Sequence, residues 1–356
     1  MPIIFKNIRR KLAAQNKAMA YLRYAIGEIF LVVIGILIAL QVNNWNENRK
    51  EQSSIKRIFL NIQQDLLSNI YEFSLADDWL VKQDSMSTKV IEGRYTRADY
   101  RNPANAALFL VGSTGYEVSA RDRSFRDLNN FIGELPATYD DLVAGLNSLY
   151  VGDNTYLQMA GNRLVKTSLA YRTYLHQHYA WVVDLAIHGT SEKAIDYFLN
   201  SSRHKQQVVL YRHQIRTQYA YTSRMYHKAI INYLKIEYYF GNYKHIPDQI
   251  KQYGLITFDR DNDYPGTYSY TNKKGKVQRF EIKYECNLIL WKGLGQNNFY
   301  YPDEVLKEKK KDELVFPFDK NVLFKMNRDK DGTIIGFTSY INGKKDAVFR
   351  KIINTE

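Results

Sequence analysis

The run Ile29–Leu40, IFLVVIGILIAL, contains no polar side chain. Extended from Tyr24 to Val42 it covers about twenty residues and is interrupted only by Glu28 and Gln41. A helix of that length, rising about 1.5 Å per residue, can cross a hydrocarbon layer about 30 Å thick. This run constrains the chain more than any other feature, because a long apolar helix must be buried in lipid or in protein.

Three interpretations of the run compete: a buried core helix, a cleavable signal peptide and an uncleaved membrane anchor. The strictly apolar part is short for a span, which keeps a core helix open. A signal peptide would need a small-x-small cleavage site, and none follows Ala39. Trp45 lies where an interfacial aromatic belongs, so we favour an anchor over residues 24–45. Besides Trp45, the side chains assigned to this anchor are Ile29, Leu31, Val32, Val33, Ile34, Ile36, Leu37, Ile38 and Leu40.

The formal net charge of +13 invites a nucleic-acid interpretation, but the charge is unevenly placed. Segment 1–23 holds six basic residues and no acid, with apolar residues between them. Such a segment is typical of an amphipathic helix on an anionic cytoplasmic membrane surface. We therefore expect membrane lipid as a partner and no nucleic acid. The surface charges are Lys6, Arg9, Arg10, Lys11, Lys17 and Arg23.

The same charges predict an orientation. Six basic residues precede the span, whereas those that follow it, from Arg49 to Arg57, are interspersed with acids. The positive-inside rule then places the N-terminus in the cytoplasm and the large C-terminal part outside. The single cysteine, Cys286, is compatible with an oxidising compartment.

The stretch YAIGEIFLVVIGILIALQVNNWNENRK, residues 24–50, resembles the N-terminal signature of an uncharacterised family of single-pass membrane proteins common in Bacteroidota. The resemblance covers about fifty residues with the upstream basic helix. It implies a bacterial inner-membrane anchor and a mainly helical extracytoplasmic part. It implies no catalytic residue.

Small residues within the span suggest a second role for it. Gly27, Gly35 and Ala39 share one helical face, and such a face lets another helix approach closely. A second copy or another membrane protein would then pair with the anchor, although small residues are also common in membrane helices. Glu28 is an intramembrane acid, which by default suggests function. Its place near the cytoplasmic end also suits a helix N-terminus, and we favour that simpler interpretation.

Residues 46–246 read as a helical bundle. Apolar residues recur at helical spacing from Asn48 to about Ile91, and Gly93 marks the expected end of this stalk-like helix. Residues 104–111 suggest a short helix between loops.

A second long helix is expected from Pro136 to Ile187, with Gly152 and Gly161 as tolerated breaks and Gly189 as its stop.

A short helix over 190–199 and a third long helix over 203–240, ended by Gly241, complete the pattern. The apolar stripes of these helices are too narrow to stand alone, so an antiparallel bundle is expected. Tyrosines concentrate here, and we favour interhelical packing over an exposed binding row. They are Tyr211, Tyr219, Tyr221, Tyr226, Tyr233, Tyr238, Tyr239 and Tyr243.

Histidines are the first candidates for chemistry in this region. His176 and His178 are two residues apart and would point to different helix faces. His204, His213 and His227 lack the i, i+4 spacing of a helical metal site. The sequence therefore predicts no metal here.

Other catalytic patterns are missing from the sequence too. It contains no HExxH, no glycine-rich phosphate loop, and the GSTG turn at 112–115 is not a nucleophile elbow. Cys286 reads as a strand cysteine, a small buried hydrophobe. We expect no catalytic residue and no cofactor, and the chain does not read as an enzyme.

Beyond a linker over 247–265, the pattern changes to period two. Phe280, Ile282 and Tyr284 alternate with charged residues, and similar alternation recurs to the C-terminus. Turn signals such as Asn342-Gly343 suit hairpins. Seven or eight strands over 266–354 predict a small antiparallel β-barrel or curved sheet, with 307–311 as a charged loop.

Two acidic runs invite a calcium interpretation. Residues 327–334 match part of an EF-hand loop, but Thr338 occupies the position of the bidentate glutamate. A hairpin explains that run better. Asp259, Asp261 and Asp263 lack a glycine at the turn, where Tyr264 stands, and read as a solvated linker.

The order GTYSYTN, RFEIKYECNLIL, LVFPFDKNVLFKMNRDKDGTIIGF and AVFRKI resembles the lipocalin-like β domain at the C-terminus of many secreted bacterial proteins, often behind a hydrolase. The resemblance implies an accessory binding or structural module whose ligand is unknown. No hydrolase motif precedes it here.

These observations predict an α+β chain: a transmembrane helix, a helical bundle with long stalk-like helices, and a C-terminal antiparallel β domain. The favoured function is a membrane-anchored periplasmic binding, scaffolding or envelope-assembly protein without catalysis. A transmembrane sensor acting through a partner, a hydrolase with a non-linear site, or a hydrolase-associated accessory protein are the alternatives.

Overall fold

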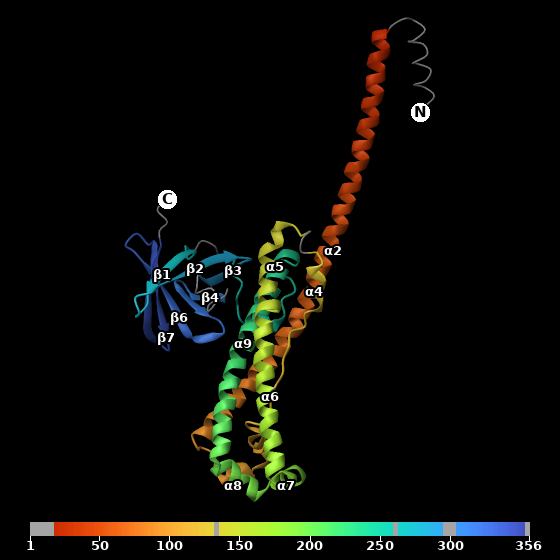
Figure 1. Cartoon of the computed structure of the whole chain (residues 1–356). Coiled ribbons are helices and arrows are strands. Elements are labelled where there is room, and N and C mark those ends of the chain that lie inside the picture. Colours follow the sequence, from red (N-terminus) through yellow and green to blue (C-terminus); the bar gives the residue numbers. More distant parts are fainter. Residues whose placement is uncertain (1–17, 132–134, 259–262, 295–303, 353–356) are drawn as a thin grey trace. The chain divides into compact units, whose positions relative to one another are not determined.

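A computed structural model describes residues 18–131, 135–258, 263–294 and 304–352. The chain divides into two compact units, Met1–Ile58 and Phe59–Glu356, which are considered separately. Helices precede strands throughout the described chain, as Figure 1 shows. The predicted α+β class is therefore confirmed.

Three long helices dominate the α part, with short elements between them. The first, α2 (Ala18–Ile91), begins in the N-terminal unit and ends at the predicted site, because Gly93 adopts a positive φ of 66°. The other two are α6 (Asn154–His178) and α9 (Ser202–Phe240). The short elements are α3 (Arg97–Arg101), η1 (Pro103–Leu110), α4 (Arg123–Asn129), η3 (Ala137–Tyr139), α5 (Asp140–Asn147), η4 (Ser148–Asp153), α7 (Trp181–His188), α8 (Glu192–Asn200) and α10 (Asp248–Lys251).

Within the C-terminal unit the long helices form the antiparallel bundle that the sequence predicts. Helices α6 and α9 lie side by side (Figure 1), and their contacts run in opposite directions, from Tyr171 with His204 to Tyr156 with Tyr221. Residues of α2 beyond position 58 pair with α9 in the same antiparallel sense, as the contacts of Asp84 with Arg212 and of Gln63 with Glu237 show. The buried stripe of α2 follows the 3.6-residue period: Phe59, Ile62, Leu66, Ile70 and Phe73.

The expectation of one continuous helix from Pro136 to Ile187 is wrong. Helix α6 ends at His178, and Tyr179 is extended with φ −136° before α7 begins. Tyr179 stacks on Trp181 and lies against Tyr197, so side-chain packing stabilises a break that no glycine or proline signals. Near Gly152 the chain instead widens into a π-helical turn, η4, while Gly161 lies inside α6 without a break.

Eight antiparallel strands form a closed barrel in sequence order, β1 to β8, with β1 paired to β8. This confirms the barrel among the two β architectures expected. The strands are β1 (Gly266–Thr271), β2 (Val277–Glu285), β3 (Leu288–Gly293), β4 (Glu304–Lys310), β5 (Glu313–Phe316), β6 (Asp319–Arg328), β7 (Ile334–Ile341) and β8 (Lys344–Lys351).

The predicted period-two alternation faces the barrel interior. Phe280, Ile282, Phe324, Met326 and Phe349 are all buried in the barrel core. Because alternate side chains point to opposite faces of a strand, these positions place every second residue inside.

Three local expectations in the β domain need correction. Residues 307–311 are mostly strand, since β4 runs to Lys310 and only the next two residues turn. Cys286 is buried but lies in the turn between β2 and β3, where it and Asn287 both have positive φ. Asp263 is no free linker residue, because it forms an ion pair with Arg328. Asp259 and Asp261 lie outside the described residues.

The hairpin interpretation of residues 327–334 is confirmed. Strand β6 ends at Arg328 and β7 begins at Ile334. The Asp329 carboxylate accepts hydrogen bonds from the backbone N–H groups of Asp331 and Thr333, at 3.0 and 2.9 Å. These bonds close the turn on itself.

Candidate functional site: an aromatic cavity in the barrel

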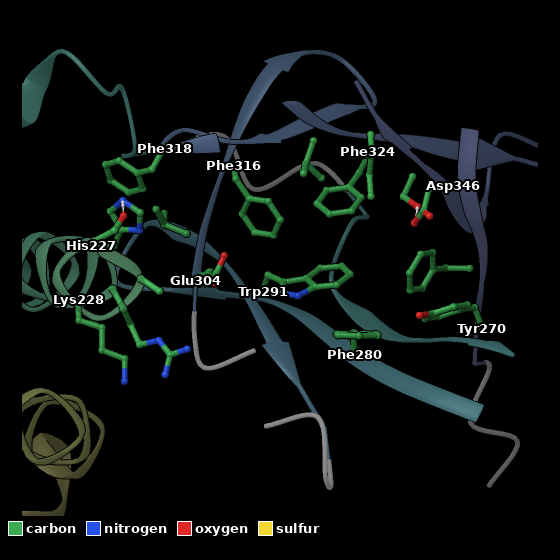
Figure 2. A pocket seen from close by; sticks show the side chains of 18 of the residues that line it. His227, Lys228, Tyr270, Phe280, Trp291, Glu304, Phe316, Phe318, Phe324 and Asp346 are labelled. Carbon is green, nitrogen blue, oxygen red and sulfur yellow. Dashed lines mark hydrogen bonds between the residues drawn. The ribbon is translucent and has the colours of Figure 1, made fainter. Parts of the chain in front are cut away.

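A cavity of about 520 Å³ lies between helix α9 and one end of the barrel interior (Figure 2). This volume lies in the range of small-molecule sites, roughly 300–1,000 Å³. Six aromatic rings from six strands make up much of its wall: Tyr270, Phe280, Trp291, Phe316, Phe324 and Phe349.

The opposite end of the barrel interior is filled. Tyr264, Tyr268 and Phe337 are fully buried there, together with Leu306 and Leu314. The cavity-lining residues of the barrel instead lie near the end that carries the β1–β2, β3–β4, β5–β6 and β7–β8 connections. The packed part closes the cavity on the opposite side.

Trp291 occupies the centre of the cavity wall, as Figure 2 shows. Phe280 stacks on its ring at 4.7 Å and 27°, and Phe324 stacks on it at 5.0 Å and 11°. The two phenyl rings hold the indole rigidly, as offset aromatic stacking does. Only 3% of Trp291 is exposed, and its Nε1–H has no acceptor among the described residues. A buried donor without an acceptor is costly, by about 1–3 kcal/mol, so it favours an acceptor brought by a bound molecule.

Helix α9 contributes one side of the cavity through residues 219–228. The His227 ring stacks on Phe318 with 3.8 Å between centroids and 15° between planes. Burial lowers the pKa of His227 to about 4, so its ring is neutral near pH 7. A neutral, stacked imidazole extends the aromatic wall across the side formed by α9.

Two cations of α9 share a single carboxylate beside the cavity. Lys228 Nζ lies 2.5 Å from Asp153 Oδ2 and 2.6 Å from the Ser148 hydroxyl. Arg224 lies 3.5 Å from the other oxygen of Asp153. Lys228 and Asp153 are both about 10% exposed in their side chains, so the pair is well shielded from water. The charge-assisted contacts with Asp153 hold the Lys228 and Arg224 side chains in place beside the cavity.

Polar groups at the far side of the cavity come from β7 and β8. The Ser339 hydroxyl donates to Asp346 Oδ2 at 3.2 Å and accepts from the Ala347 backbone N–H at 3.0 Å. Asp346 and Tyr270 lie opposite His227 and Phe318 in Figure 2, with Trp291 between them. Glu304 also lines the cavity, near α9. The cavity therefore has an apolar centre and polar groups on both sides.

The predicted membrane anchor lies in the described part of α2. An 18-residue window of this helix has a mean hydropathy of 2.5 and none of it is buried, so the helix is long and apolar enough to cross a membrane. Among the assigned side chains Ile29 is 65% exposed and Trp45 is 62% exposed.

The small residues of this helix lie on an open surface of the described chain. A Cβ added at Gly27 or at Gly35 would meet no other atom of the described residues within 4 Å, and Ala39 is exposed. A second helix therefore has room to approach this face. The assignments of the anchor to lipid and of its small-residue face to a helix partner stay predictions.

The predicted membrane-surface charges fall mostly outside the described residues, since only Arg23 belongs to α2. Lys6, Arg9, Arg10, Lys11 and Lys17 precede the described part of the chain.

The histidines are dispersed. His204 is fully buried beside Tyr171, whose hydroxyl lies 2.9 Å from Nδ1, and burial lowers the pKa of His204 to about 4. Among the described residues, no three His, Cys, Asp or Glu side chains come together as metal ligands would. Of the histidines in the described chain, only His227 lines the cavity.

The tyrosines of α9 divide between two roles. Tyr211 is fully buried and donates to Gln83, as interhelical packing requires, and Tyr226 bonds to Tyr253 across 3.0 Å. Tyr219 is 40% exposed and lines the cavity.

The sequence did not reveal the cavity. Its inward alternation identified Phe280, Phe324 and Phe349 as interior residues, but the same pattern describes a filled barrel equally well. The signal that could have suggested a hollow is the crowding of aromatic residues towards one end of the strands, which only becomes visible once the strand register is known.

Comparison with known proteins reaches only the N-terminal part of the chain. Residues 28–92 match a family of unknown function, DUF6090. The match covers the apolar run and the helical stretch that follows it, in agreement with an uncharacterised family at this end of the chain. No curated protein matches the chain, and no solved structure matches it.

Proposed function

We propose that this chain is a membrane-anchored binding protein whose β-barrel takes up a small apolar molecule. The observation that carries the proposal is the aromatic cavity of about 520 Å³ that surrounds the rigid indole of Trp291, whose N–H has no acceptor among the described residues. A wall of stacked rings with few polar groups is the usual composition of a small-molecule site. The polar side chains form pairs around this wall, which suits retention of a ligand better than its chemical conversion.

The proposal places segment 1–23 in the cytoplasm and the helical body and barrel in the periplasm of a bacterium, with α2 crossing the inner membrane once. The basic N-terminal segment and the apolar run support this orientation. Fusions of alkaline phosphatase and of β-galactosidase to the C-terminus test it. Phosphatase activity with an inactive β-galactosidase is expected, and the reverse result contradicts the orientation.

Ligand uptake is tested with the full chain in phosphatidylcholine nanodiscs and the neutral fluorescent probe N-phenyl-1-naphthylamine. Val322 lines the cavity from β6, so the Val322→Trp substitution fills it. The matched control is Val348→Trp, at a position of β8 that is 44% exposed and outside the lining. Probe emission above that of empty nanodiscs is expected for the wild type and the control.

The filled variant should lose that emission. Equal emission from both variants would show that the probe binds elsewhere and would overturn the proposed site. Circular dichroism and thermal unfolding of each variant establish that the barrel still folds.

A sensor role has one observation in its favour. Helix α9 lines the cavity and also holds α2, because Arg212 and Arg216 both pair with Asp84. A ligand that shifts α9 would therefore act on α2. Hydrogen exchange with and without the probe separates the two roles: changed protection in α2 around Asp84 supports sensing, and changes confined to the barrel exclude it.

A further inference from the structure

The two ends of the barrel differ in charge. In an antiparallel barrel with strands in sequence order, successive connections alternate between the ends. The β1–β2 and β7–β8 connections therefore lie at the same end, and because β1 pairs with β8 they are neighbours. The β4–β5 and β6–β7 turns lie at the opposite end.

Two neighbouring hairpins at the cavity end are rich in lysine. The β1–β2 connection contains Lys273, Lys274 and Lys276, and β8 begins with Lys344 and Lys345. All five are exposed. Asp346, which follows them, is the acid of this group, and its carboxylate accepts a hydrogen bond from Ser339.

The turns at the opposite end have a smaller excess. Counted with the strand ends beside them, the β4–β5 and β6–β7 turns hold five cations, Lys309, Lys310, Lys311, Arg328 and Lys330, against four acids, Asp312, Glu313, Asp329 and Asp331. Among these hairpins the larger excess of lysines is therefore found at the cavity end. These lysines do not line the cavity themselves, but they lie in the chain next to lining residues, since Tyr270 precedes the β1–β2 connection and Asp346 follows Lys345. An excess of one sign of charge beside an apolar cavity concentrates ions of the other sign.

We infer that the ligand of the cavity is an anionic amphiphile, whose apolar body lies against the aromatic wall and whose acidic group lies at the lysine-rich rim. The inference rests on the proposed binding function and specifies its ligand class. The apolar body fits the rings around Trp291, and an oxygen of the ligand can accept from the buried Nε1–H that lacks an acceptor among the described residues.

The acids that line the cavity do not offset the rim. Asp346 stands against five lysines, and Glu304 lies on the side where Arg224 and Lys228 add positive charge, shared with Asp153. Among the described residues at this end, a carboxylate or phosphate thus meets a net positive charge. A cationic amphiphile would meet net repulsion there.

The test compares two probes that differ only in charge: 11-(dansylamino)undecanoic acid and its methyl ester. Both are titrated at pH 8 into the full chain in phosphatidylcholine nanodiscs, with empty nanodiscs subtracted. The rim variant carries Lys273→Gln, Lys344→Gln and Lys345→Gln. The control variant loses three charges elsewhere on the barrel through Lys309→Gln, Lys311→Gln and Lys330→Gln, all at exposed positions.

The acid is expected to bind the wild type and the control about tenfold more tightly than the ester, and the rim variant should lose most of this preference. The preference should also fall as salt is added. Equal affinity for acid and ester, or an equal effect of both lysine triples, would overturn the inference while leaving the binding function intact. Failure of both probes to distinguish wild type from Val322→Trp would instead refute the binding function itself.

An acidic group at the rim could belong to a free fatty acid or to a phospholipid, so two competitors distinguish the sources. Displacement of the dansyl acid by oleate supports a free acid. Displacement when phosphatidylglycerol replaces part of the nanodisc lipid supports a phospholipid headgroup. Displacement by neither contradicts the anionic amphiphile.

Discussion

Asp77 offers the sharpest test of how the helical bundle is assembled. It lies on α2 between the fully buried Ala76 and Leu80, and its Oδ1 is buried without a hydrogen-bond partner among the described residues. Burial, and then repulsion from Asp78, raises the pKa of Asp77 to about 7 from 3.8. The ionised carboxylate therefore destabilises the folded state at neutral pH.

The magnitude follows from the difference between the two pKa values. The folded protein holds the Asp77 proton more tightly than the unfolded chain, so this residue lowers stability as the pH rises from about 4 to about 7. At 1.36 kcal/mol per pKa unit the full effect is about 4 kcal/mol. Asn mimics the protonated carboxyl. Asp77→Asn should therefore match the wild type near pH 4 and exceed its stability by up to about 4 kcal/mol at pH 8.

The assay is thermal unfolding of the full chain in nanodiscs, followed by tryptophan fluorescence from pH 4 to pH 8. The buried His204 and His227 act in the opposite direction, because their lowered pKa values make stability fall as the pH drops from 6.5 towards 4. Subtracting the wild-type curve from the Asp77→Asn curve removes this shared contribution. Only the Asp77 effect remains in the difference.

Asp78→Asn is the matched control, because Asp78 is exposed and acts on Asp77 only through its charge. It should give a much smaller gain at pH 8. A difference curve that does not change with pH, or an Asp77→Asn protein that is less stable at pH 8, would refute the assignment of Asp77 to a desolvated site.

Two further predictions concern the barrel and its attachment to the helices. Lys235 of α9 is 4% exposed and forms an ion pair with Glu285 of β2. Lys235→Met removes one of the positive charges beside this shielded carboxylate and should destabilise the protein by about 3 kcal/mol in urea unfolding. An unchanged unfolding midpoint would show that the ion pair does not contribute to stability. A Cβ on Gly336 would overlap the Phe349 carbonyl oxygen, so Gly336→Ala should disrupt the β7–β8 pairing and lower Tm by several degrees. Gly152→Ala is the control, because Gly152 is exposed and an added Cβ there would meet no described atom within 4 Å. Equal melting of both glycine variants would contradict the close approach of the two strands.

Much of the fold could be read from periodicity. The apolar stripe from Phe59 to Phe73 and the stop at Gly93 follow from local rules, because helical spacing and a positive-φ glycine are properties of short segments. The break at Tyr179 could not be read in this way. It depends on the rings of Trp181 and Tyr197, and their mutual packing exists only after the chain has folded back on itself.

The sequence by itself determined that this chain has an apolar helix able to span a membrane, a helical body and a β domain with alternating interior residues. These properties depend on composition and on spacings of a few residues. Only the tertiary structure decided that the sheet closes, that a cavity remains at one end of its interior beside α9, and that the lysine-rich β1–β2 and β7–β8 hairpins are neighbours at that end. A cavity is the space left between side chains from many strands, and its size depends on register and closure, which no local pattern specifies.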